Sequence, residues 1–460
     1  MTDPKEFRLR RLGEILPGQV SRPGDLHYDK ATAIWAKPTG RLPRVIVHAL
    51  KAEDIQVAIR FARDVGLPFS VRAGGHDWAG RALCDGLVID LRGMSQVVIA
   101  PENGIARIGG GARAAEVAAA ADPLGLAVAA GQVGIVGMGG FTTGGGYGGL
   151  IGRCGLALDN LVSAEVVLAD GRIVTADHAH EPELFWALRG GGGNFGVVAA
   201  MEHRVHDMPS VRSGLLLYPF AEAKAVLDGY AAIAATALDE LTAQVGIVFG
   251  PDGAPAVMAI PTWCGRPEDG EARLRPFFQL GTVLTGSLEP MPYGASLTFY
   301  DSFLTDGNRV LMETCWIPAL EGSAIDPFIA AAANAPSPGC AIFTHEFRGA
   351  ASRVPETATA FGLRRDHVLI EIMATWPERG DPSDDQRHRE WARASRRSFD
   401  TMAIPGGYAN LLGPDHADRA AHSYGPNAAR LAEAKRQYDP DNCFRSAIPL
   451  PFTAASMPPY

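Results

Sequence analysis

Glycine is the residue that most constrains how this 460-residue chain can fold, because it is concentrated in three clusters. About half of the residues between 131 and 155 are glycine, and shorter clusters lie at 73–77 and 190–196. Such density disfavours a stable helix and is expected where backbone approaches a ligand closely or adopts positive φ. A glycine loop after a strand also exposes backbone N–H groups that can bind a pyrophosphate. The clusters therefore predict a ligand site built from backbone.

Composition narrows the class of ligand. The chain carries 42 Lys and Arg against 51 Asp and Glu, a net charge of -9, which argues against a nucleic-acid or anionic-membrane partner. With 47% apolar residues it can bury one large core or two coupled cores. Its six cysteines are scattered, which predicts reduced thiols. No apolar run reaches 18 residues and no secretory segment is evident, so we expect a cytoplasmic protein with a small-molecule ligand.

Hydrophobic periodicity predicts alternating strands and helices in the first two hundred residues. An Asp170-Gly171 turn predicts a hairpin. No repeat or flexible linker is present, so the parts should pack together. Predicted strands lie at 43–47, 68–72, 87–91, 162–168, 172–174, 197–205, 244–249 and 368–376, and predicted helices at 51–66, 114–121, 181–189, 221–235, 384–401 and 427–438.

Two common nucleotide motifs are disfavoured. The 190–196 run contains G-x-G-x-x-G, but it follows a helix and leads into a strand, the reverse of the order that a nicotinamide-binding fold requires. No G-x-x-x-x-G-K-[ST] motif occurs, which argues against a P-loop hydrolase. His178-Ala179-His180 lacks further ligands at metal-binding spacing, so we expect a surface loop and no metal site.

Five further segments occur in one order and span nearly the whole chain: VRAGGHD at 71–77, GMGGFTTGGGYG at 137–148, GLALDNL at 155–161, GGGGNFGVV at 190–198 and YDPDNCF at 438–444. In sequence and order they resemble the berberine bridge enzyme-like oxidases of the vanillyl-alcohol oxidase superfamily. The resemblance implies an α+β fold with an FAD-binding domain formed by 1–206 and 403–460. Residues 207–402 would form a substrate domain, an antiparallel sheet covered by helices.

The same resemblance implies that FAD is attached covalently through His76. Neutral imidazole is a nucleophile near pH 7, which suits this role. Many relatives have a second link from a cysteine, but Val133 stands at that position and has no nucleophile, so we expect a single link. Val136 matches a position that gates oxygen in the family, where valine goes with oxidases; it could also be simple core packing.

Residue by residue, the resemblance implies a cofactor site in the glycine loops and near the C-terminus. It comprises Arg72, Ala73, Gly74, Gly75, His76, Asp77, Val136, Gly137, Gly140, Thr142, Gly144, Gly145, Tyr147, Asp159, Asn160, Gly196, Val198, Tyr408 and Asn410. At Ser446-Ala447-Ile448 the chain departs from the polar residues usual in relatives, which puts the cofactor contacts or the substrate entrance there in doubt.

Glu371 is the leading candidate for a catalytic base. Burial of an unpaired carboxylate among apolar neighbours raises its pKa toward neutrality, where it can accept a proton. The pattern also fits a strand with one solvated face, on which Leu369, Glu371, Met373 and Thr375 alternate outward. The resemblance favours the base, because the matching position in the family carries a Glu or Gln that helps deprotonate the substrate.

Tyr408 and Tyr147 are the other catalytic candidates, since active-site tyrosines occupy these positions in the family. A phenol can hydrogen-bond a substrate oxygen or act as a base, but each could instead be a packed aromatic. His345-Glu346 could line the pocket or form a surface pair. Leu411 replaces an aromatic residue, which predicts a more apolar pocket wall than in sugar-oxidising relatives.

Together these features predict an FAD-linked oxidase that transfers a hydride from a C–H next to oxygen or nitrogen to flavin N5. O2 would then reoxidise the flavin and yield H2O2. The substrate would be a small organic molecule, and the apolar wall favours a secondary metabolite over an oligosaccharide. Alternatives are a flavin-dependent oxygenase or oxidative cyclase, a non-catalytic FAD-retaining binding protein and, more distantly, an NAD-dependent dehydrogenase. The sequence does not indicate an oligomeric state.

Overall fold

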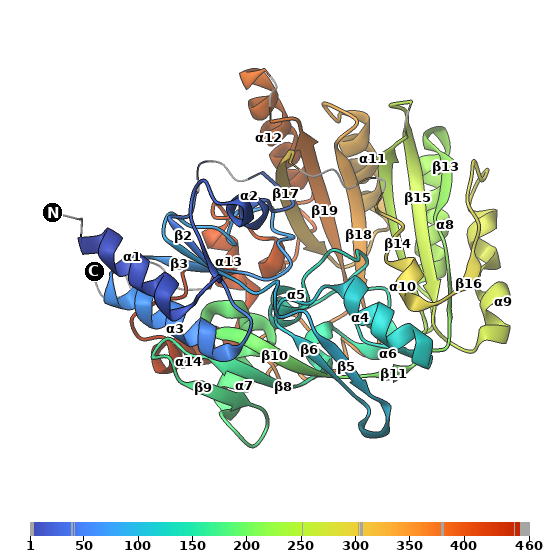
Figure 1. The fold of residues 1–460 in the computed structure, drawn as a ribbon. Coiled ribbons are helices and arrows are strands. Elements are labelled where there is room, and N and C mark those ends of the chain that lie inside the picture. Colours follow the sequence, from blue (N-terminus) through green and yellow to red (C-terminus); the bar gives the residue numbers. More distant parts are fainter. Residues whose placement is uncertain are drawn as a thin grey trace.

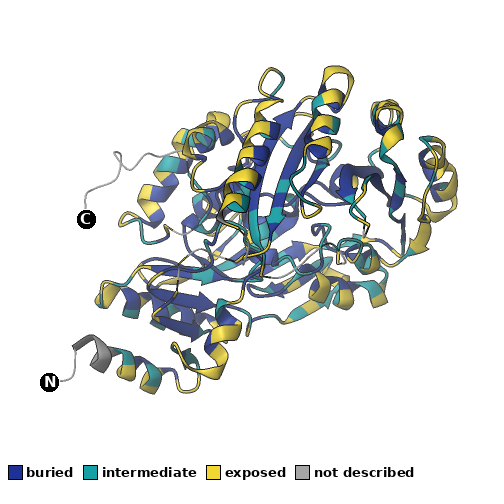
Figure 2. Cartoon of the chain, turned by 90° about the horizontal axis from the view of Figure 1, so that it is seen from above, coloured by how far each residue is buried: buried dark blue, intermediate teal, exposed yellow. Residues whose placement is uncertain are grey.

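The computed structural model describes residues 4–37, 40, 42–250, 252–301, 303, 307–378, 381–445 and 447–450. Three main sheets organise these residues, with helices packed on their faces (Figure 1). The predicted α+β class is confirmed. The inner strands of the sheets are buried, whereas the covering helices turn one side to solvent (Figure 2).

The first sheet has the strand order β1-β2-β4-β3. Its strands β2 (Val45–His48), β4 (Leu87–Asp90) and β3 (Phe69–Arg72) are parallel, and β1 (Val20–Ser21) pairs antiparallel with β2. Helix α3 (Ala52–Asp64) packs its apolar stripe into the same core, as the three- and four-residue spacing predicts. The glycine loop 73–77 starts where β3 ends.

The second sheet is antiparallel, in the order β5-β6-β10-β8-β9. Its hairpin between β8 (Leu161–Val167) and β9 (Ile173–Ala176) confirms the turn predicted at Asp170-Gly171. The other strands are β5 (Val97–Ala100), β6 (Ile105–Gly109) and β10 (Val197–Arg204), and helices α4 (Ala114–Ala121) and α7 (Pro182–Gly191) pack beside them.

The third sheet is the largest, with eight antiparallel strands in the order β16-β12-β15-β14-β18-β19-β17 and β13 paired to β15. Helices α8 (Ala223–Ala234), α11 (Ile325–Ala333) and α12 (Pro382–Arg397) cover one face (Figure 1). The other face is turned toward the glycine loops. The strands are β12 (Val211–Ser213), β13 (Leu216–Pro219), β14 (Leu241–Phe249), β15 (Pro255–Trp263), β16 (Glu289–Met291), β17 (Arg309–Ile317), β18 (Ala341–Phe347) and β19 (His367–Trp376).

The remaining α-helices and strands lie beside and between the sheets. They are α1 (Pro4–Ile15), α2 (Leu26–Thr32), β7 (Leu126–Ala127), α5 (Met138–Gly144), α6 (Ile151–Cys154), β11 (His206–Asp207), α9 (Gly270–Leu274), α10 (Tyr293–Ser296), α13 (Ala417–Ser423) and α14 (Ala428–Tyr438). The six cysteines are free thiols, as predicted. Within the described ranges, no helix has both the length and the apolar character needed to cross a membrane.

The expectation that the glycine-rich segment 131–155 holds no stable helix is wrong, since α5 and α6 both lie within it. Tertiary packing outweighs helix propensity here. A Cβ on Gly139 in α5 would lie 3.0 Å from the carbonyl oxygen of Gly110, and one on Gly152 in α6 would lie 2.3 Å from that of Asp239. Glycine therefore lets these short helices pack directly against neighbouring backbone.

The C-terminal segment returns to the glycine loop 190–196. Lys435 in α14 donates to the carbonyl of Asn194 at 2.8 Å and pairs with the buried Asp439. The side-chain amide of Asn194 donates in turn to the carbonyl of Ile448 at 2.9 Å. These bonds tie the last described residues to a loop some 250 residues earlier in the chain. The division into 1–206, 207–402 and 403–460 stays a prediction.

Candidate active site

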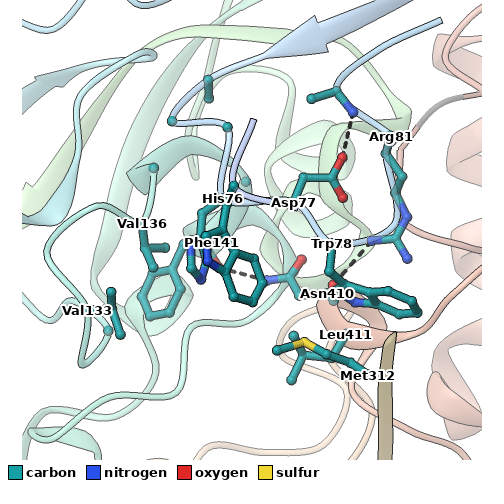
Figure 3. Close-up of a pocket in the computed structure, with 18 of the residues that line it drawn as sticks. His76, Asp77, Trp78, Arg81, Val133, Val136, Phe141, Met312, Asn410 and Leu411 are labelled. Carbon is teal, nitrogen blue, oxygen red and sulfur yellow. Dashed lines mark hydrogen bonds between the residues drawn. The ribbon is translucent and has the colours of Figure 1, made fainter. Parts of the chain in front are cut away.

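A cavity of about 810 Å³ lies where the three glycine loops face the third sheet (Figure 3). Most of the predicted site residues line it: Ala73, Gly74, Gly75, His76, Asp77, Val136, Gly137, Gly140, Tyr147, Gly196, Val198, Glu371, Tyr408 and Asn410. The rest lie behind its wall: Arg72, Thr142, Gly144, Gly145, Asp159 and Asn160.

The cavity floor is formed by glycine backbone in direct contact. A Cβ on Gly74 would lie 2.5 Å from both the nitrogen and the Cα of Gly137, and one on Gly137 would lie 2.4 Å from the nitrogen of Gly74. A real Cβ does not approach backbone this closely, so the crossing of the two loops requires glycine at both positions. Gly75 has φ +79, which favours glycine as well.

Two predicted residues behind the wall hold the loops in place. Arg72 donates to the carbonyls of Lys30, Ala31 and Ala33 at the end of α2, and burial lowers its pKa to about 10. Asp159 pairs with the buried Arg364 at 2.9 Å and accepts the backbone N–H of Leu156. The side chains of Arg72 and Asp159 are thus both bonded to other residues of the protein.

Asn160 and Thr142 also bond to other parts of the protein. The Asn160 amide donates to the carbonyls of Cys154 and Leu156 at 2.9 and 2.8 Å. Thr142 is fully buried, with its hydroxyl 3.4 Å from Nε2 of His203. Gly144 and Gly145 lie against the side chains of Asn410 and Tyr408.

His76 lies at the centre of the glycine-lined side. Its ring stacks on the indole of Trp35, with centroids 4.4 Å apart and planes 22° from parallel. Nδ1 is buried and has no hydrogen-bond partner among the described residues. Burial lowers the pKa of the imidazole to about 4, so the ring is neutral at pH 7. An unpartnered neutral imidazole is available as a nucleophile.

Val133 and Val136 lie on one side of His76, and Asp77 and Arg81 on the other (Figure 3). Neither valine offers a nucleophile. Asp77 accepts the backbone N–H groups of Ala79 and Ala82 at 3.0 and 2.8 Å. The carboxylate thus shapes its own loop.

Tyr408 offers an oxygen that already accepts two hydrogen bonds. The backbone N–H of Gly146 and the amide of Asn410 both donate to it at 2.9 Å. Burial raises the pKa of the phenol to about 12, and these donors oppose the rise by stabilising the phenolate. Among the three catalytic candidates, Tyr408 is the one whose oxygen is surrounded by donors.

Tyr147 has the opposite arrangement, with its ring 4.8 Å from that of Tyr408. Its hydroxyl lies 2.7 Å from Nε2 of His367, whose Nδ1 lies 2.7 Å from the carbonyl of Arg365. A carbonyl only accepts, so Nδ1 carries the hydrogen, Nε2 accepts and the Tyr147 hydroxyl donates. Burial raises the pKa of Tyr147 and lowers that of His367 to about 3. The Tyr147 hydroxyl therefore keeps its proton and directs its hydrogen bond to His367.

Glu371 lies on β19, 5% exposed, on the opposite side of the cavity. Its carboxylate is 3.1 Å from Nε2 of His345 on β18. The side chains that alternate with it, Leu369, Met373 and Thr375, line the same cavity. The alternative of a solvated strand face is therefore wrong.

The hydrogen bonds continue from this pair along the sheet. The amide nitrogen of Gln244 on β14 lies 3.4 Å from the His345 ring, and the hydroxyl of Tyr300 donates to the Gln244 oxygen. Burial raises the pKa of Tyr300, and the charge of Glu371 adds to the rise. Glu346 points to the other face, where it accepts from Tyr230 and from the backbone of Ala243. Of the predicted His345-Glu346 pair, only His345 lines the cavity.

Sequence reasoning missed Trp35, Gln244, Tyr300 and His367. A signal existed for Gln244, which is the one amide in a strand otherwise made of apolar residues, threonine and glycine. Trp35, Tyr300 and His367 reach the site through tertiary packing, which no local pattern indicates.

The rest of the cavity wall is largely apolar and includes Tyr300, Phe303, Phe343, Met312, Leu411 and Trp78. Ala447 and Ile448 of the altered tail also line it, whereas Ser446 lies outside the described residues. His178 and His180 are exposed. No cluster of three potential metal ligands occurs within the described part of the chain.

Comparison with known proteins gives two family matches. The family described as FAD binding domain matches residues 43–177, and the family described as berberine and berberine like matches residues 407–451. (R)-6-hydroxynicotine oxidase of Paenarthrobacter nicotinovorans is 30% identical, over 94% of this chain and 96% of its own length. The uncharacterized FAD-linked oxidoreductase YgaK of Bacillus subtilis is 29% identical, over 95% and 97%.

Among solved structures, 6-hydroxy-D-nicotine oxidase from Arthrobacter nicotinovorans superposes with a TM-score of 0.84 at 28% identity, covering 94% of this chain and 97% of that one. The matched FAD domain contains two of the three glycine clusters. The glycine-lined cavity and its unpartnered neutral imidazole fit an FAD that is bound by backbone and attached through a histidine.

Proposed function

Because the chain belongs to the berberine bridge enzyme-like family of FAD-linked oxidoreductases, we propose that it is an oxidase of a small organic substrate, with FAD attached through His76. The substrate is oxidised at a C–H next to oxygen or nitrogen. When bound, FAD would supply the hydride acceptor, its N5, and its reoxidation by O2 would give H2O2. The observation that carries this proposal is the cavity with an unpartnered imidazole on one wall and a buried carboxylate on the other.

Glu371 is the base that takes the substrate proton. Its carboxylate is buried where it lines the cavity, and Nε2 of His345 lies 3.1 Å from one of its oxygens. A hydrogen bond to one oxygen leaves the other free to accept a proton from the substrate. A positioned base of this kind contributes about 100-fold to 10,000-fold to a rate.

Tyr408 assists at the other side of the substrate. Its oxygen is held by Gly146 and Asn410, so its own O–H is directed by neither bond and is available to a substrate oxygen or nitrogen. Tyr147 packs its ring against Tyr408, but its hydroxyl donates a hydrogen bond to His367. We therefore assign Tyr147 the role of positioning Tyr408.

The substrate lies against an apolar, aromatic wall, which suits a secondary metabolite better than an oligosaccharide. Tyr300, Phe343 and Leu411 contribute to this surface. Val133 leaves His76 as the single attachment point, and Val136 lines the cavity near it, with the side-chain size expected at an oxygen gate. Residues 1–206 and 403–460 form the FAD-binding unit and 207–402 the unit that covers it.

The test is the spectrum and intact mass of the protein after acid denaturation. We expect flavin to stay with the wild-type chain, with one attachment, and to be released from His76→Ala. Release from both would overturn the covalent link, and a second attachment would overturn the assignment of Val133.

Turnover is tested by substrate panels under anaerobic conditions, followed by O2. Bleaching of the flavin and one H2O2 per product support an oxidase. Labelled oxygen in the product would instead select the oxygenase, and failure of both substrates and sulfite to bleach the flavin would favour a protein that only retains FAD.

A further inference from the structure

The orientation of the His76 ring depends on stacking. No hydrogen bond to either ring nitrogen occurs among the described residues, and Nδ1 is fully enclosed. The contact that fixes the ring plane is the indole of Trp35, stacked at 4.4 Å. Offset stacking of two aromatic rings is worth about 0.5–1.5 kcal/mol beyond burial, enough to select one ring plane over others.

Trp35 is held in place from both sides. Its backbone N–H donates to the carbonyl of Gly75, next to His76, at 3.0 Å. On the other side, its carbonyl accepts a hydrogen bond from the backbone N–H of Gly307. Two residues further on, the backbone N–H of Lys37 donates to the carbonyl of Asn308 at 2.9 Å. The indole is only 7% exposed. The segment is thus anchored to the histidine loop and to the chain just before β17.

We propose that Trp35 is a positioning residue for covalent attachment of FAD: its indole holds the His76 imidazole in the plane needed for bond formation and keeps water from the ring. This inference rests on the proposed link through His76. It assigns the attachment step to a pair of residues instead of the histidine alone.

The attachment replaces one C–H of the 8α-methyl group and the imidazole N–H with a C–N bond. The two protons and two electrons that are removed pass to O2, which becomes H2O2. Because the imidazole must attack through a nitrogen lone pair, a protonated ring cannot react. The rate of attachment therefore depends on both the orientation and the protonation state of the His76 ring.

Burial is the cause of the lowered pKa of His76, about 4, and no charged group contributes to the shift. Asp77 is turned to Ala79 and Ala82, Arg72 to the end of α2, and Lys37 pairs with Glu378. The other elements at the ring present Val136 and Phe141. Loss of the indole admits water, so the pKa of His76 should return toward 6.5.

The experiment compares wild type with Trp35→Phe, which keeps a flat ring, and Trp35→Leu, which keeps apolar volume without one. Each protein is produced under riboflavin limitation, mixed with FAD, and the linked fraction is followed by intact mass at pH 7.5 and 5.5. Trp391→Leu is the matched control, because Trp391 is buried to a similar degree, 8% exposed, but lies on α12 in the core beneath the third sheet and does not line the cavity. Thermal unfolding and non-covalent FAD binding verify that each variant is folded.

We expect wild type, Trp35→Phe and Trp391→Leu to link at similar rates at both pH values. Trp35→Leu should link at least tenfold more slowly at pH 7.5, and about tenfold more slowly again at pH 5.5, where a histidine of pKa near 6.5 is mostly protonated. A role in stability alone would not produce this pH dependence.

The outcomes separate the two proposals. Wild type without linked flavin overturns the His76 link itself. Wild type that links, together with Trp35→Leu that links at the same rate at both pH values, overturns the role of Trp35 only. If Trp35→Leu does not fold, Trp35→Met replaces it, with the same expected results.

Discussion

The two walls of the cavity recognise their ligands in different ways. The glycine wall is built from backbone: loops 73–77 and 131–137 touch through Gly74 and Gly137, with no room for a Cβ. The sheet wall is built from side chains, among them Gln244, His345 and Glu371 on three neighbouring strands. Substitutions in the first wall should therefore change whether the cofactor is bound, and those in the second should change what is done to the substrate.

The walls also differ in how polar groups are satisfied. On the glycine side, His76 has no hydrogen-bond partner among the described residues. On the sheet side, hydrogen bonds link Tyr300, Gln244, His345 and Glu371 into one series. An unpartnered group is available for bond formation, whereas a satisfied series fixes the orientation of its last member.

The largest effect should come from breaking the glycine wall with Gly74→Ala. The new Cβ would lie 2.5 Å from two backbone atoms of Gly137, so the loops must separate. Overpacking of this kind costs about 1–3 kcal/mol or more, and the cavity floor loses its shape. We expect most bound flavin to be lost, as measured by absorbance per protein, with a lower melting temperature.

Gly13→Ala is the control for this prediction. No neighbouring atom lies within 4 Å of a Cβ at that position, which is inside α1 and away from the cavity. Alanine also raises helix propensity, so the melting temperature should hold or rise. Equal destabilisation by the two substitutions would contradict the distinction between crossed loops and open space.

The second effect concerns the sheet wall, where Glu371→Gln removes the proposed base. We expect the rate of anaerobic flavin reduction by substrate to fall by about 100-fold or more, with flavin content unchanged. Glu346→Gln is the matched control, because this carboxylate is also buried in the same sheet but faces Tyr230 on the other side. Its loss should cost about 1 kcal/mol of stability without slowing reduction. Loss of flavin from Glu371→Gln would show that this wall also binds the cofactor.

The two walls of the cavity also differ in how far they can be predicted from the sequence. The glycine wall was predictable because backbone contact demands glycine, and glycine is visible in a sequence: 73–77 and 137–149 both line the cavity in part. Glu371 and His345 were identified as candidates, but their pairing depends on the register of β18 against β19, where Phe343 lies opposite Glu371. No local pattern fixes that register.

The helices inside the glycine-rich segment also show that tertiary contacts can override a prediction from local sequence. Low helix propensity predicts none between 131 and 155, yet α5 and α6 form because neighbouring backbone packs against Gly139 and Gly152. Trp35 is a further case, since it reaches His76 from a segment some 40 residues earlier. Both features are set by tertiary contacts.

The smallest effects are expected at Tyr408 and Tyr147, and they should distinguish the roles of these two tyrosines. Tyr408→Phe removes the acceptor of two buried N–H groups, from Gly146 and Asn410, which costs about 1–3 kcal/mol, and it removes the proposed substrate contact. We expect anaerobic flavin reduction to slow by about tenfold, a loss of one strong hydrogen bond in the transition state.

Tyr147→Phe should have a different result, because its hydroxyl donates to His367 and away from the reaction. The unfolding free energy should fall by about 1 kcal/mol as Nε2 of His367 loses its donor, while the rate of reduction stays within about twofold. Equal slowing by the two substitutions would contradict the assignment, since it would require the Tyr147 hydroxyl, which donates to the neutral His367, to take part in the chemistry.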